Sequence, residues 1–349
     1  MATPEVTTDA RVAADVLRSG GLVGLPTETV YGLAALATDT DAVRRVFAVK
    51  GRPADHPLIV HLPDVTHAAR WADPVPEALA PLAAALWPGP LTVVVRAAAH
   101  VPAEVTGGRP TVALRVPAHP LALEVLALLD DGVAAPSANR FGRVSPTCAA
   151  DVVADLDGDV DLVLDGGPCA VGVESTIVDL TGDVPEVLRT GAVSAAALER
   201  IVGGEVRSWS GQGAARAPGM LAAHYAPTAR VLVADDVGGA VDLLAGVRPV
   251  TGTADAAHGS VRVALLAGTA DDLEALAAAV DATAGFEPVA LEPVGDADGY
   301  AHHLYARLRQ ADRLGCAVVL AVAPPAAGVG VAVRDRLGRA AAGSAGASS

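Results

Sequence analysis

Hydrophobic and polar positions alternate between helix-like and strand-like periods along most of the chain. Apolar runs rich in β-branched residues predict buried strands, and apolar residues three or four positions apart predict amphipathic helices. In the first part, the predicted strands are 22–25, 58–62, 91–95, 111–116, 161–164, 175–180 and 187–189. The predicted helices are 9–18, 41–50 with Thr40 as N-cap, 77–87, 119–129, 147–156 and 194–202. This alternation is typical of an α/β protein.

The periodicity is lost from Gly203 to Thr228, and a second α/β pattern follows. Its predicted strands are 231–234, 261–266, 288–291 and 317–321, and its predicted helices are 271–280, 300–314 and 330–340. This pattern indicates a small doubly wound parallel sheet. We therefore predict a first domain over 1–203, a linker over 204–229, a second domain over 230–340 and a disordered tail, rich in Ala, Gly and Ser, over 341–349.

The chain is acidic, with 25 Lys and Arg against 40 Asp and Glu in 349 residues and a net charge of −15. Residues 1–210 hold 15 of these cations and 26 of these acids, which gives them a charge of −11. Such a charge disfavours nonspecific binding to nucleic acid or anionic lipid. The uncharged stretch 316–333 contains Pro324 and Pro325, so it does not predict a membrane span. Residues 1–20 carry acids and no apolar core, so they do not predict a signal peptide.

The cysteines and the absence of common catalytic motifs limit the kinds of site that the sequence can form. Cys148, Cys169 and Cys316 are widely spaced and form no CxxC pair, which favours a reduced cytoplasm over a disulfide framework or a zinc site. The sequence has no HExxH or GxGxxG motif and no Ser-His-Asp order. The candidate groups are mainly cations and hydroxyls, which stabilise phosphates and carboxylates by position and charge.

Lys50 is the only lysine of the chain, and Arg52 follows it at the end of a predicted helix. An ammonium is a compact point charge, whereas a guanidinium is a wide planar fork, so the two are not interchangeable at a shaped site. On a segment stiffened by Pro53 and Pro57, both cations can converge on one polyanion. The alternative is a solvated helix C-terminus stabilised by the helix dipole. His61 ends the next predicted strand, and a structural histidine is its alternative.

Arg115 lies in an otherwise apolar predicted strand, on the same face as Thr111. A buried charge is costly, so Arg115 needs an anion, either a core Asp or Glu or a substrate carboxylate. Segment 26–32 follows a buried strand and carries two hydroxyls, a carboxylate and a phenol where open α/β sheets bind ligands. A polar turn closed by its own threonines is the alternative.

Other polar segments follow or begin predicted strands. Segments 135–139 and 145–147 offer small hydroxyl and amide groups and precede a helix N-terminus, which predicts a cradle for an anion or ribose. Ser175 begins a strand, and Arg189 ends one. Segment 217–227 keeps an aromatic side chain between fixed turns, unlike a Gly/Ser spacer, so we expect it to dock on another part of the protein.

Together these segments closely resemble the YrdC-like family, specifically its two-domain threonylcarbamoyl-AMP synthases. The resemblance rests on PTETVYGL (26–33), KGRPADHPLIVH (50–61), WPGPLT (87–92), VALRVPAHP (112–120), APSAN (135–139), SPT (145–147), GVESTIVDL (172–180), LRTG (188–191) and APGMLAAHYAP (217–227), in the family's order. The part after residue 230 matches more weakly, through its α/β pattern and residues 328–339. The resemblance implies a YrdC-like twisted mixed open β-sheet with flanking helices, followed by a smaller Rossmann-like α/β domain.

The resemblance also implies a function, that of an L-threonylcarbamoyladenylate synthase. Such a nucleotidyltransferase condenses L-threonine, bicarbonate or CO2 and ATP, with Mg²⁺, into threonylcarbamoyl-AMP and pyrophosphate. This is the first step of threonylcarbamoyladenosine formation in tRNA. We expect a cytoplasmic location, a downstream threonylcarbamoyl-transferase complex as partner, and neither membrane binding nor strong direct nucleic-acid binding.

The family's site residues carry over to matching positions of this sequence. The implied catalytic residues are Lys50 and Arg52. The implied L-threonine-binding residues are Thr29, His61, Arg115, Ala135 and Ser175. The implied ATP-binding residues are Lys50, Arg52, His56, Thr111, Ser137, Asn139, Ser145, Arg189 and Tyr225. Tyr225 would make the linker a lid over the active site, and no side chain is assigned as a metal ligand.

The sequence departs from the family pattern at a few positions. His56 stands where the family usually has asparagine, Ala54 where it commonly has serine, and 221–223 where it often has basic residues. Two other functions remain as alternatives. One is a nonenzymatic RNA-binding module of the same fold, against which the charge of residues 1–210 argues. The other is carbamoyl transfer of the hydrogenase-maturation type, which brings zinc-finger cysteines that three scattered cysteines do not match.

Overall fold

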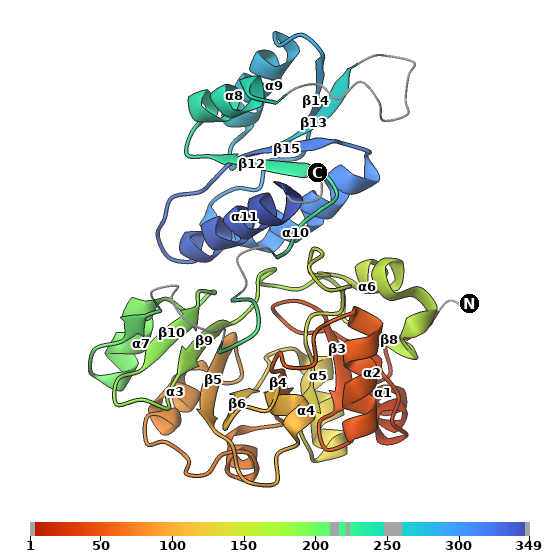
Figure 1. Ribbon diagram of the computed structural model, residues 1–349, viewed down its shortest axis with the longest axis vertical. Coiled ribbons are helices and arrows are strands. Elements are labelled where there is room, and N and C mark those ends of the chain that lie inside the picture. Colours follow the sequence, from red (N-terminus) through yellow and green to blue (C-terminus); the bar gives the residue numbers. More distant parts are fainter. Residues whose placement is uncertain (1–3, 210–215, 221–223, 248–259, 346–349) are drawn as a thin grey trace. The chain divides into compact units, whose positions relative to one another are not determined.

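The computed structural model describes residues 4–209, 216–220, 224–247 and 260–345. The chain divides into two compact units, one made of residues 1–141 and 145–221 and the other of residues 142–144 and 222–349. Each unit has its own sheet and its own hydrophobic core (Figure 1). None of the helices in the described ranges combines the length and the hydropathy that a membrane span requires.

The first unit is built on a mixed sheet with the strand order β1-β8-β2-β3-β7-β4-β6-β5-β9-β10-β11. Its strands are β1 (Glu5–Thr7), β2 (Val23–Leu25), β3 (Gly32–Leu36), β4 (Ile59–His61), β5 (Leu91–Arg96), β6 (Thr111–Arg115), β7 (Val133–Ala134), β8 (Leu162–Leu164), β9 (Thr176–Asp179), β10 (Glu186–Arg189) and β11 (Arg207–Ser208). Its helices are α1 (Ala10–Arg18), α2 (Thr40–Lys50), α3 (Leu79–Leu86), α4 (Ala103–Thr106), α5 (Pro120–Leu129), α6 (Ala149–Leu156) and α7 (Ala195–Val202), with 3₁₀ turns at Val65–Arg70 and Asp157–Asp159. Since β6 pairs parallel with β4 and antiparallel with β5, the predicted mixed sheet with flanking helices is confirmed.

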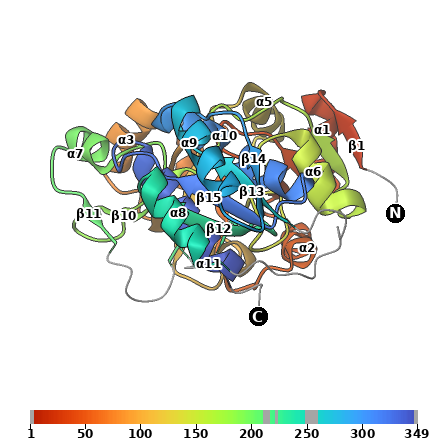
Figure 2. The same cartoon turned by 90° about the horizontal axis from the view of Figure 1, so that it is seen from above.

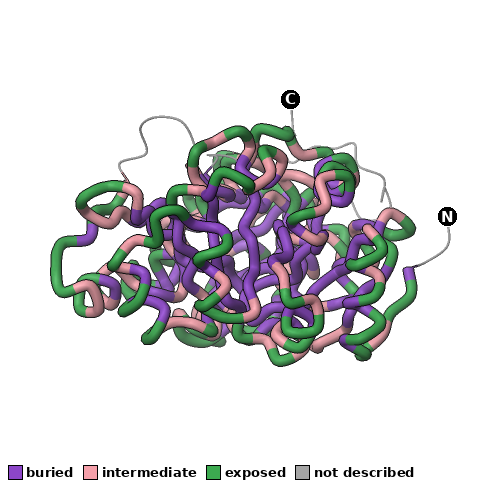
Figure 3. The backbone as a smooth tube through the Cα atoms, turned by 90° about the horizontal axis from the view of Figure 1, so that it is seen from below, coloured by how far each residue is buried: buried purple, intermediate pink, exposed green. Residues whose placement is uncertain are grey.

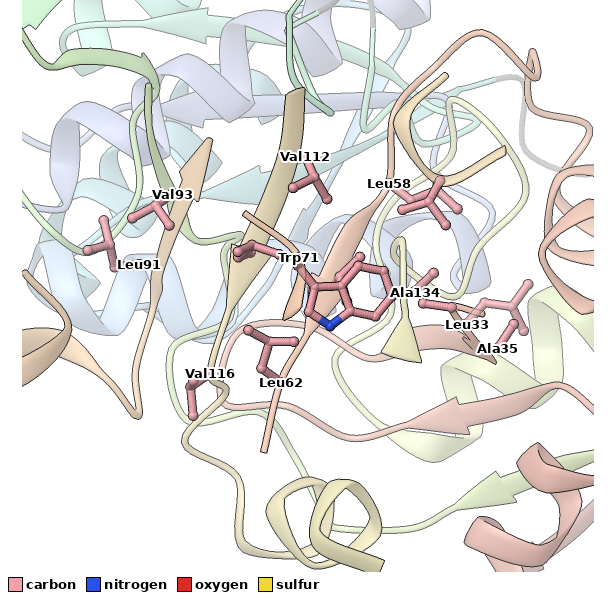
Figure 4. Close-up of a cluster of buried hydrophobic side chains, with 14 of the residues drawn as sticks. Leu33, Ala35, Leu58, Leu62, Trp71, Leu91, Val93, Val112, Val116 and Ala134 are labelled. Atoms are coloured by element: carbon pink, nitrogen blue, oxygen red, sulfur yellow. The ribbon is translucent and has the colours of Figure 1, made fainter. Parts of the chain in front are cut away.

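Apolar side chains from strands and helices pack into the core of the first unit. Figure 3 shows buried stretches of the chain (purple) running through the interior and exposed stretches (green) in the turns at the outside. In the cluster of Figure 4, the buried Trp71 indole lies among side chains of the sheet, including Leu62 and Ala134. A second cluster joins α1 to α5 through residues such as Leu17 and Val125. Burial of this apolar surface is the main driving force for the fold.

The second unit has a sheet with the strand order β12-β15-β13-β14, in which all pairs are parallel. Its elements are β12 (Arg230–Ala234), α8 (Val237–Ala245), β13 (Val261–Leu266), α9 (Ala270–Asp281), β14 (Phe286–Ala290), α10 (Ala297–Arg313), β15 (Val318–Val322) and α11 (Gly330–Ala345). Helices α8 and α9 cover one face of this sheet, and α10 and α11 cover the other (Figures 1 and 2). The predicted doubly wound parallel sheet is therefore confirmed.

Helix α2 shows how local sequence fixes an element that leads to the candidate site. The Asp39 carboxylate accepts hydrogen bonds from the backbone N–H groups of Asp41 and Ala42, both at 3.0 Å, so Asp39 is the N-cap. The prediction of Thr40 as N-cap was wrong by one residue, because aspartate is at least as good a cap. Gly51 ends the helix at φ 63°, a left-handed conformation that suits glycine.

Some elements were not predicted from the pattern. Strands β1, β3, β7 and β11 and helices α4 and α8 were missed. Strand β3 is made of Gly, Leu and Ala, which lack the β-branched signal of a strand. The predicted disorder from residue 341 is wrong for 341–345, because α11 continues to Ala345 and the Ser344 hydroxyl accepts a hydrogen bond from the Val231 N–H at 3.0 Å. Residues 346–349 lie outside the described residues.

Candidate functional site

A buried ion pair lies where the turn between β2 and β3 meets the end of β6. The Arg115 guanidinium donates to the Glu28 carboxylate at 2.6 Å, to the Thr29 hydroxyl at 2.9 Å and to the Gly89 carbonyl at 3.1 Å. Glu28 also accepts a hydrogen bond from the Ala118 N–H at 3.0 Å. Of the two anions predicted for Arg115, the structure thus contains the core acid. A guanidinium has five N–H donors, so two remain beyond these three bonds.

Burial and pairing act in opposite directions on Glu28. Burial raises the pKa of this carboxyl, but the Arg115 charge and the Ala118 N–H outweigh that effect and hold the pKa below its ordinary value. Glu28 is therefore ionised at neutral pH and offsets the Arg115 charge. The pair therefore forms a nearly neutral group at the end of β6, inside the sheet.

His61 ends β4 and is in register with Arg115 on the neighbouring parallel strand β6. Its side chain is buried, and its Nδ1 atom has no hydrogen-bond partner among the described residues. Burial and the Arg115 charge lower the pKa of His61 to about 3, so the imidazole is neutral at physiological pH. Buried polar atoms normally have a partner, so this nitrogen could accept a hydrogen bond from a ligand, and the role of His61 stays a prediction beside the structural alternative.

Ser175 joins the predicted L-threonine side to Arg189. The Ser175 hydroxyl lies 2.7 Å from the Thr92 hydroxyl and accepts a hydrogen bond from the Arg189 guanidinium at 3.0 Å. Arg189 also donates to the Ser175 carbonyl at 3.0 Å and to the Pro218 carbonyl at 3.1 Å. The predicted residues Ser175 and Arg189 thus lie together, and Thr92 and Pro218, which are distant in sequence, join them around one buried cation.

Lys50, the lone lysine, is buried and holds a turn of the backbone. Its ammonium donates to the carbonyls of Ser137 and Asn139 at 2.5 and 2.6 Å, and its own carbonyl accepts the Phe141 N–H at 2.8 Å. No described carboxylate lies within ion-pair distance of Lys50. Burial, with a smaller contribution from the Arg52 charge, lowers the pKa of Lys50 well below its ordinary value. The alternative of a solvated helix terminus is therefore wrong for Lys50.

Arg52 and His56 lie on the segment that follows α2. Arg52 is partly buried and donates to the Pro57 carbonyl at 3.0 Å. The His56 ring centre lies 5.7 Å from that of Phe141, and burial together with the Arg52 charge lowers the pKa of His56. The segment after Lys50 and the turn at 137–141 are therefore neighbours, as a shared nucleotide site would require.

The remaining predicted residues of the first unit lie on or beside its strands. The buried Ser145 hydroxyl donates to the Glu174 carboxylate at 2.7 Å. The Ala135 N–H donates to the Ile59 carbonyl at 3.1 Å, and Thr111 begins β6 opposite Arg96 of β5. Among the described residues, no group of three or more His, Cys, Asp and Glu is placed to hold a metal ion.

Residues 216–220 of the predicted linker pack against the sheet of the first unit, so the expectation that segment 217–227 contacts another part of the protein is confirmed for these residues. Ala217 and Met220 pack in an apolar cluster with side chains of the sheet, which are Ile59, Val94, Ala113, Ile177 and Leu188. Arg216 forms ion pairs with Asp179, at 2.8 Å, and with Glu186. Residues 210–215 and 221–223, including the positions where the family often has basic residues, lie outside the described residues.

Tyr225, predicted to bind ATP from the linker, belongs to the second unit. Its ring is buried, with its centre 5.6 Å from that of Tyr305, and the Arg336 guanidinium lies 5.3 Å above it. A charge over an aromatic face at this distance is a cation–π contact. This packing fixes Tyr225 within the second unit, so its role toward ATP stays a prediction.

Sequence reasoning did not assign three residues that the structure places among the predicted ones. They are Glu28, Thr92 and Glu174, which bond to Arg115, Ser175 and Ser145 respectively. Each lies within a motif that carries the resemblance. The sequence did contain a signal for them: an acid or hydroxyl in an apolar segment is expected to be buried, and a buried polar group needs a hydrogen-bond or ion-pair partner.

Comparisons with known proteins show which family the chain resembles. A family model described as "Telomere recombination" matches residues 15–191, and one described as "Threonylcarbamoyl-AMP synthase, C-terminal domain" matches residues 193–342. The chain is 39% identical over 336 residues to threonylcarbamoyl-AMP synthase from Pyrococcus abyssi, covering 95% of this chain and 93% of that protein. It is 42% identical over 227 residues to the Bacillus subtilis enzyme of that name, covering 64% and 66% of the two chains. The crystal structure of P. abyssi Sua5 complexed with L-threonine matches with a TM-score of 0.83 and 36% identity, covering 97% of this chain and 98% of that one.

Proposed function

The chain belongs to the two-domain threonylcarbamoyl-AMP synthase family, and we propose that it condenses L-threonine, bicarbonate or CO2 and ATP into threonylcarbamoyl-AMP and pyrophosphate. It is thus a nucleotidyltransferase. The observation that carries the proposal is the group of Arg115, Glu28, Thr29 and His61, because it combines a paired cation with an unpaired neutral nitrogen. That combination suits an amino acid substrate, which brings both a carboxylate and an amine.

L-threonine would bind at this group. The two free N–H donors of Arg115 would hold the substrate carboxylate, and Thr29 and Ser175 would contact its hydroxyl. The neutral His61 would accept a hydrogen bond from the amine or carbamate, since an imidazole with a pKa of about 3 does not compete as a cation. Ala135 would line the same subsite with its backbone.

ATP would bind along the turn that Lys50 holds. Lys50 and Arg52 are the proposed catalytic cations, and as an ammonium Lys50 has one N–H beyond its two bonds to carbonyls. The other proposed contacts to the nucleotide and its phosphates are His56, Thr111, Ser137, Asn139, Ser145, Arg189 and Tyr225. The reason is their chemistry: hydroxyls, amides and cations suit ribose and phosphate oxygens.

The reaction places few demands on general acids or bases. The threonine amine captures CO2 as a carbamate, and a carbamate oxygen then attacks the α-phosphorus in line with the departing pyrophosphate. The barrier is mostly alignment and charge repulsion, so fixed cations are the natural catalysts.

We also expect Mg²⁺ to accompany ATP, where it would offset phosphate charge. The Glu174 carboxylate and Ser145 hydroxyl, 2.7 Å apart, offer the oxygen donors that Mg²⁺ prefers, and they would be the protein's side of such a site. The product would pass to a threonylcarbamoyl-transferase complex that acts on tRNA. We place the protein in the cytoplasm, where ATP and tRNA are available.

The test is to incubate the purified protein with ATP, labelled bicarbonate and L-threonine. We expect release of pyrophosphate and a labelled adenylate that forms only when threonine is present. Absence of both products would overturn the proposed reaction. RNA binding that weakens steeply with salt in the absence of ATP would instead favour the RNA-binding alternative.

A further inference from the structure

Residues 142–144 belong to the second unit, although the segments on both sides of them belong to the first. On one side the chain continues from the turn at 137–139, whose carbonyls accept hydrogen bonds from Lys50. On the other side it continues into Ser145, which donates to Glu174. Both flanks are parts of the proposed ATP site. Whatever holds residues 142–144 therefore acts on that site through a few peptide bonds.

The backbone of this segment is held by the residue that follows Tyr225. The Ala226 N–H donates to the Gly142 carbonyl at 2.9 Å, and Arg143 forms a parallel β-bridge with Ala226. Tyr225 has a left-handed φ of 62°, which is unusual for a residue other than glycine, and its ring packs against Tyr305. The packing of Tyr225 thus fixes the strand-like partner of residues 142–144.

Side chains of α10 hold the same segment. The Arg309 guanidinium donates to the Val144 carbonyl. Arg143 donates to the Thr228 hydroxyl at 2.9 Å and lies 3.8 Å from the Asp312 carboxylate, which also accepts the Thr228 N–H at 2.9 Å. Tyr305, Arg309 and Asp312 follow one another at intervals of four and three residues, so they share one face of the helix.

We propose that this face of α10, made of Tyr305, Arg309 and Asp312, is a positioning element for ATP binding. By holding residues 142–144, it sets the segments 137–139 and 145 before the nucleotide arrives. A loop that is ordered in advance spares ATP the entropic cost of ordering it. The inference rests on the proposed function and gives the second unit a role in ATP binding, because this face holds residues 142–144 and, through Tyr305, also packs against Tyr225.

The test compares Arg309→Gln with Arg307→Gln in the full-length protein. Arg307 lies on the same helix and pairs with Glu292 at 2.6 Å, so its replacement removes an ion pair without touching residues 142–144. We expect Arg309→Gln to raise the KM for ATP about 5- to 10-fold and the KM for threonine less than about 2-fold. Arg309→Lys should recover part of the loss, because an ammonium still reaches one carbonyl. Arg307→Gln should behave as the wild type.

A second measurement does not depend on catalysis. Amide hydrogen exchange over residues 140–146, without ligands, should be faster in Arg309→Gln than in Arg307→Gln, because the loop loses a bond that restrains it. If Arg309→Gln fails to fold, Arg143→Gln serves instead, since this half-exposed side chain makes the same kind of contact. Equal exchange rates, or equal rises of both KM values, would overturn the inference. If the wild-type protein forms no adenylate, the proposed function is overturned. The hydrogen-exchange comparison would then still show whether α10 orders residues 140–146.

Discussion

Two buried cations of the first unit are held in opposite ways. Arg115 is offset by a carboxylate, Glu28, at 2.6 Å, so its region is nearly neutral. Lys50 donates to two neutral carbonyls at 2.5 and 2.6 Å and has no carboxylate partner among the described residues, so burial of its charge is unfavourable and lowers its pKa. The difference matches the proposed ligands. A zwitterionic amino acid suits the nearly neutral Arg115–Glu28 pair. A polyphosphate suits Lys50, a cation that has no carboxylate partner among the described residues.

The two cations should also respond differently when a substrate binds. The Arg115 pair is complete before any substrate binds, because breaking it would leave a buried charge alone. The pKa of Lys50 is lowered by burial, and an approaching phosphate would raise it again, since an opposite charge favours the ammonium. ATP binding should therefore be linked to the charge of Lys50.

The largest expected effect comes from breaking the balanced pair. Glu28→Gln keeps the shape of the side chain but leaves the Arg115 guanidinium buried without its carboxylate. We expect the free energy of unfolding to fall by about 3–5 kcal/mol, as measured by urea denaturation at pH 7. The matched control is Arg18→Gln, which removes the exposed pair with Asp15 at 2.7 Å and should cost no more than about 0.5 kcal/mol. Similar losses in the two variants would show that Arg115 does not depend on Glu28.

The next effect concerns the cation without a carboxylate. Lys50→Arg keeps the charge but replaces a compact ammonium with a planar fork, which does not fit between the Ser137 and Asn139 carbonyls. We expect the KM for ATP to rise about 10-fold or more, with the KM for threonine changed less than about 2-fold. Arg45→Lys, an Arg–Lys exchange on the exposed face of the same helix, should leave both values unchanged. Normal ATP dependence of Lys50→Arg would mean that any cation serves at this position.

A third effect is a pH dependence of stability, and it comes from His61, which lies beside the Arg115–Glu28 pair. The pKa of His61 is about 3 in the folded protein and about 6.5 in the unfolded chain, so between these values the unfolded state binds more protons. The contribution of His61 to stability is therefore present above about pH 6.5 and falls by about 1.4 kcal/mol for each pH unit between 6.5 and 3. The lowered pKa of Glu28 acts in the same direction, but only as the pH falls toward its ordinary value of 4.5.

The measurement is urea denaturation at pH 6.5, 5.75 and 5. His61→Gln should flatten the loss of stability over this range. His67→Gln is the control of opposite sign, because hydrogen bonding to Asp64 raises the pKa of His67 and its stabilising effect is present at acid pH. An unchanged slope in His61→Gln would show that His61 is solvated or protonated in the folded protein.

Much of the fold was readable from the sequence because its signals are local. The hydrophobic period marked most helices and strands, and the parallel second sheet followed from their alternation. The missed strand β3, whose residues are Gly, Leu and Ala, is a strand only because β2 and β7 pair with it on either side. The cap at Asp39 was missed by one residue, since two neighbouring residues are both good caps.

For the candidate site, the sequence determined which chemistry is present and the tertiary structure decided how each group is held. Charge, motifs and the lone Lys50 were sufficient to indicate a cationic site for phosphate and carboxylate. They could not show that Glu28 balances Arg115, or that Lys50 holds the carbonyls of Ser137 and Asn139, because each pair is more than 80 residues apart in sequence. The hydrophobic period of the sequence determines which side chains are buried. Only the packing of the sheet determines which buried charges lie next to each other. That pairing is important because an unpaired buried charge destabilises the fold.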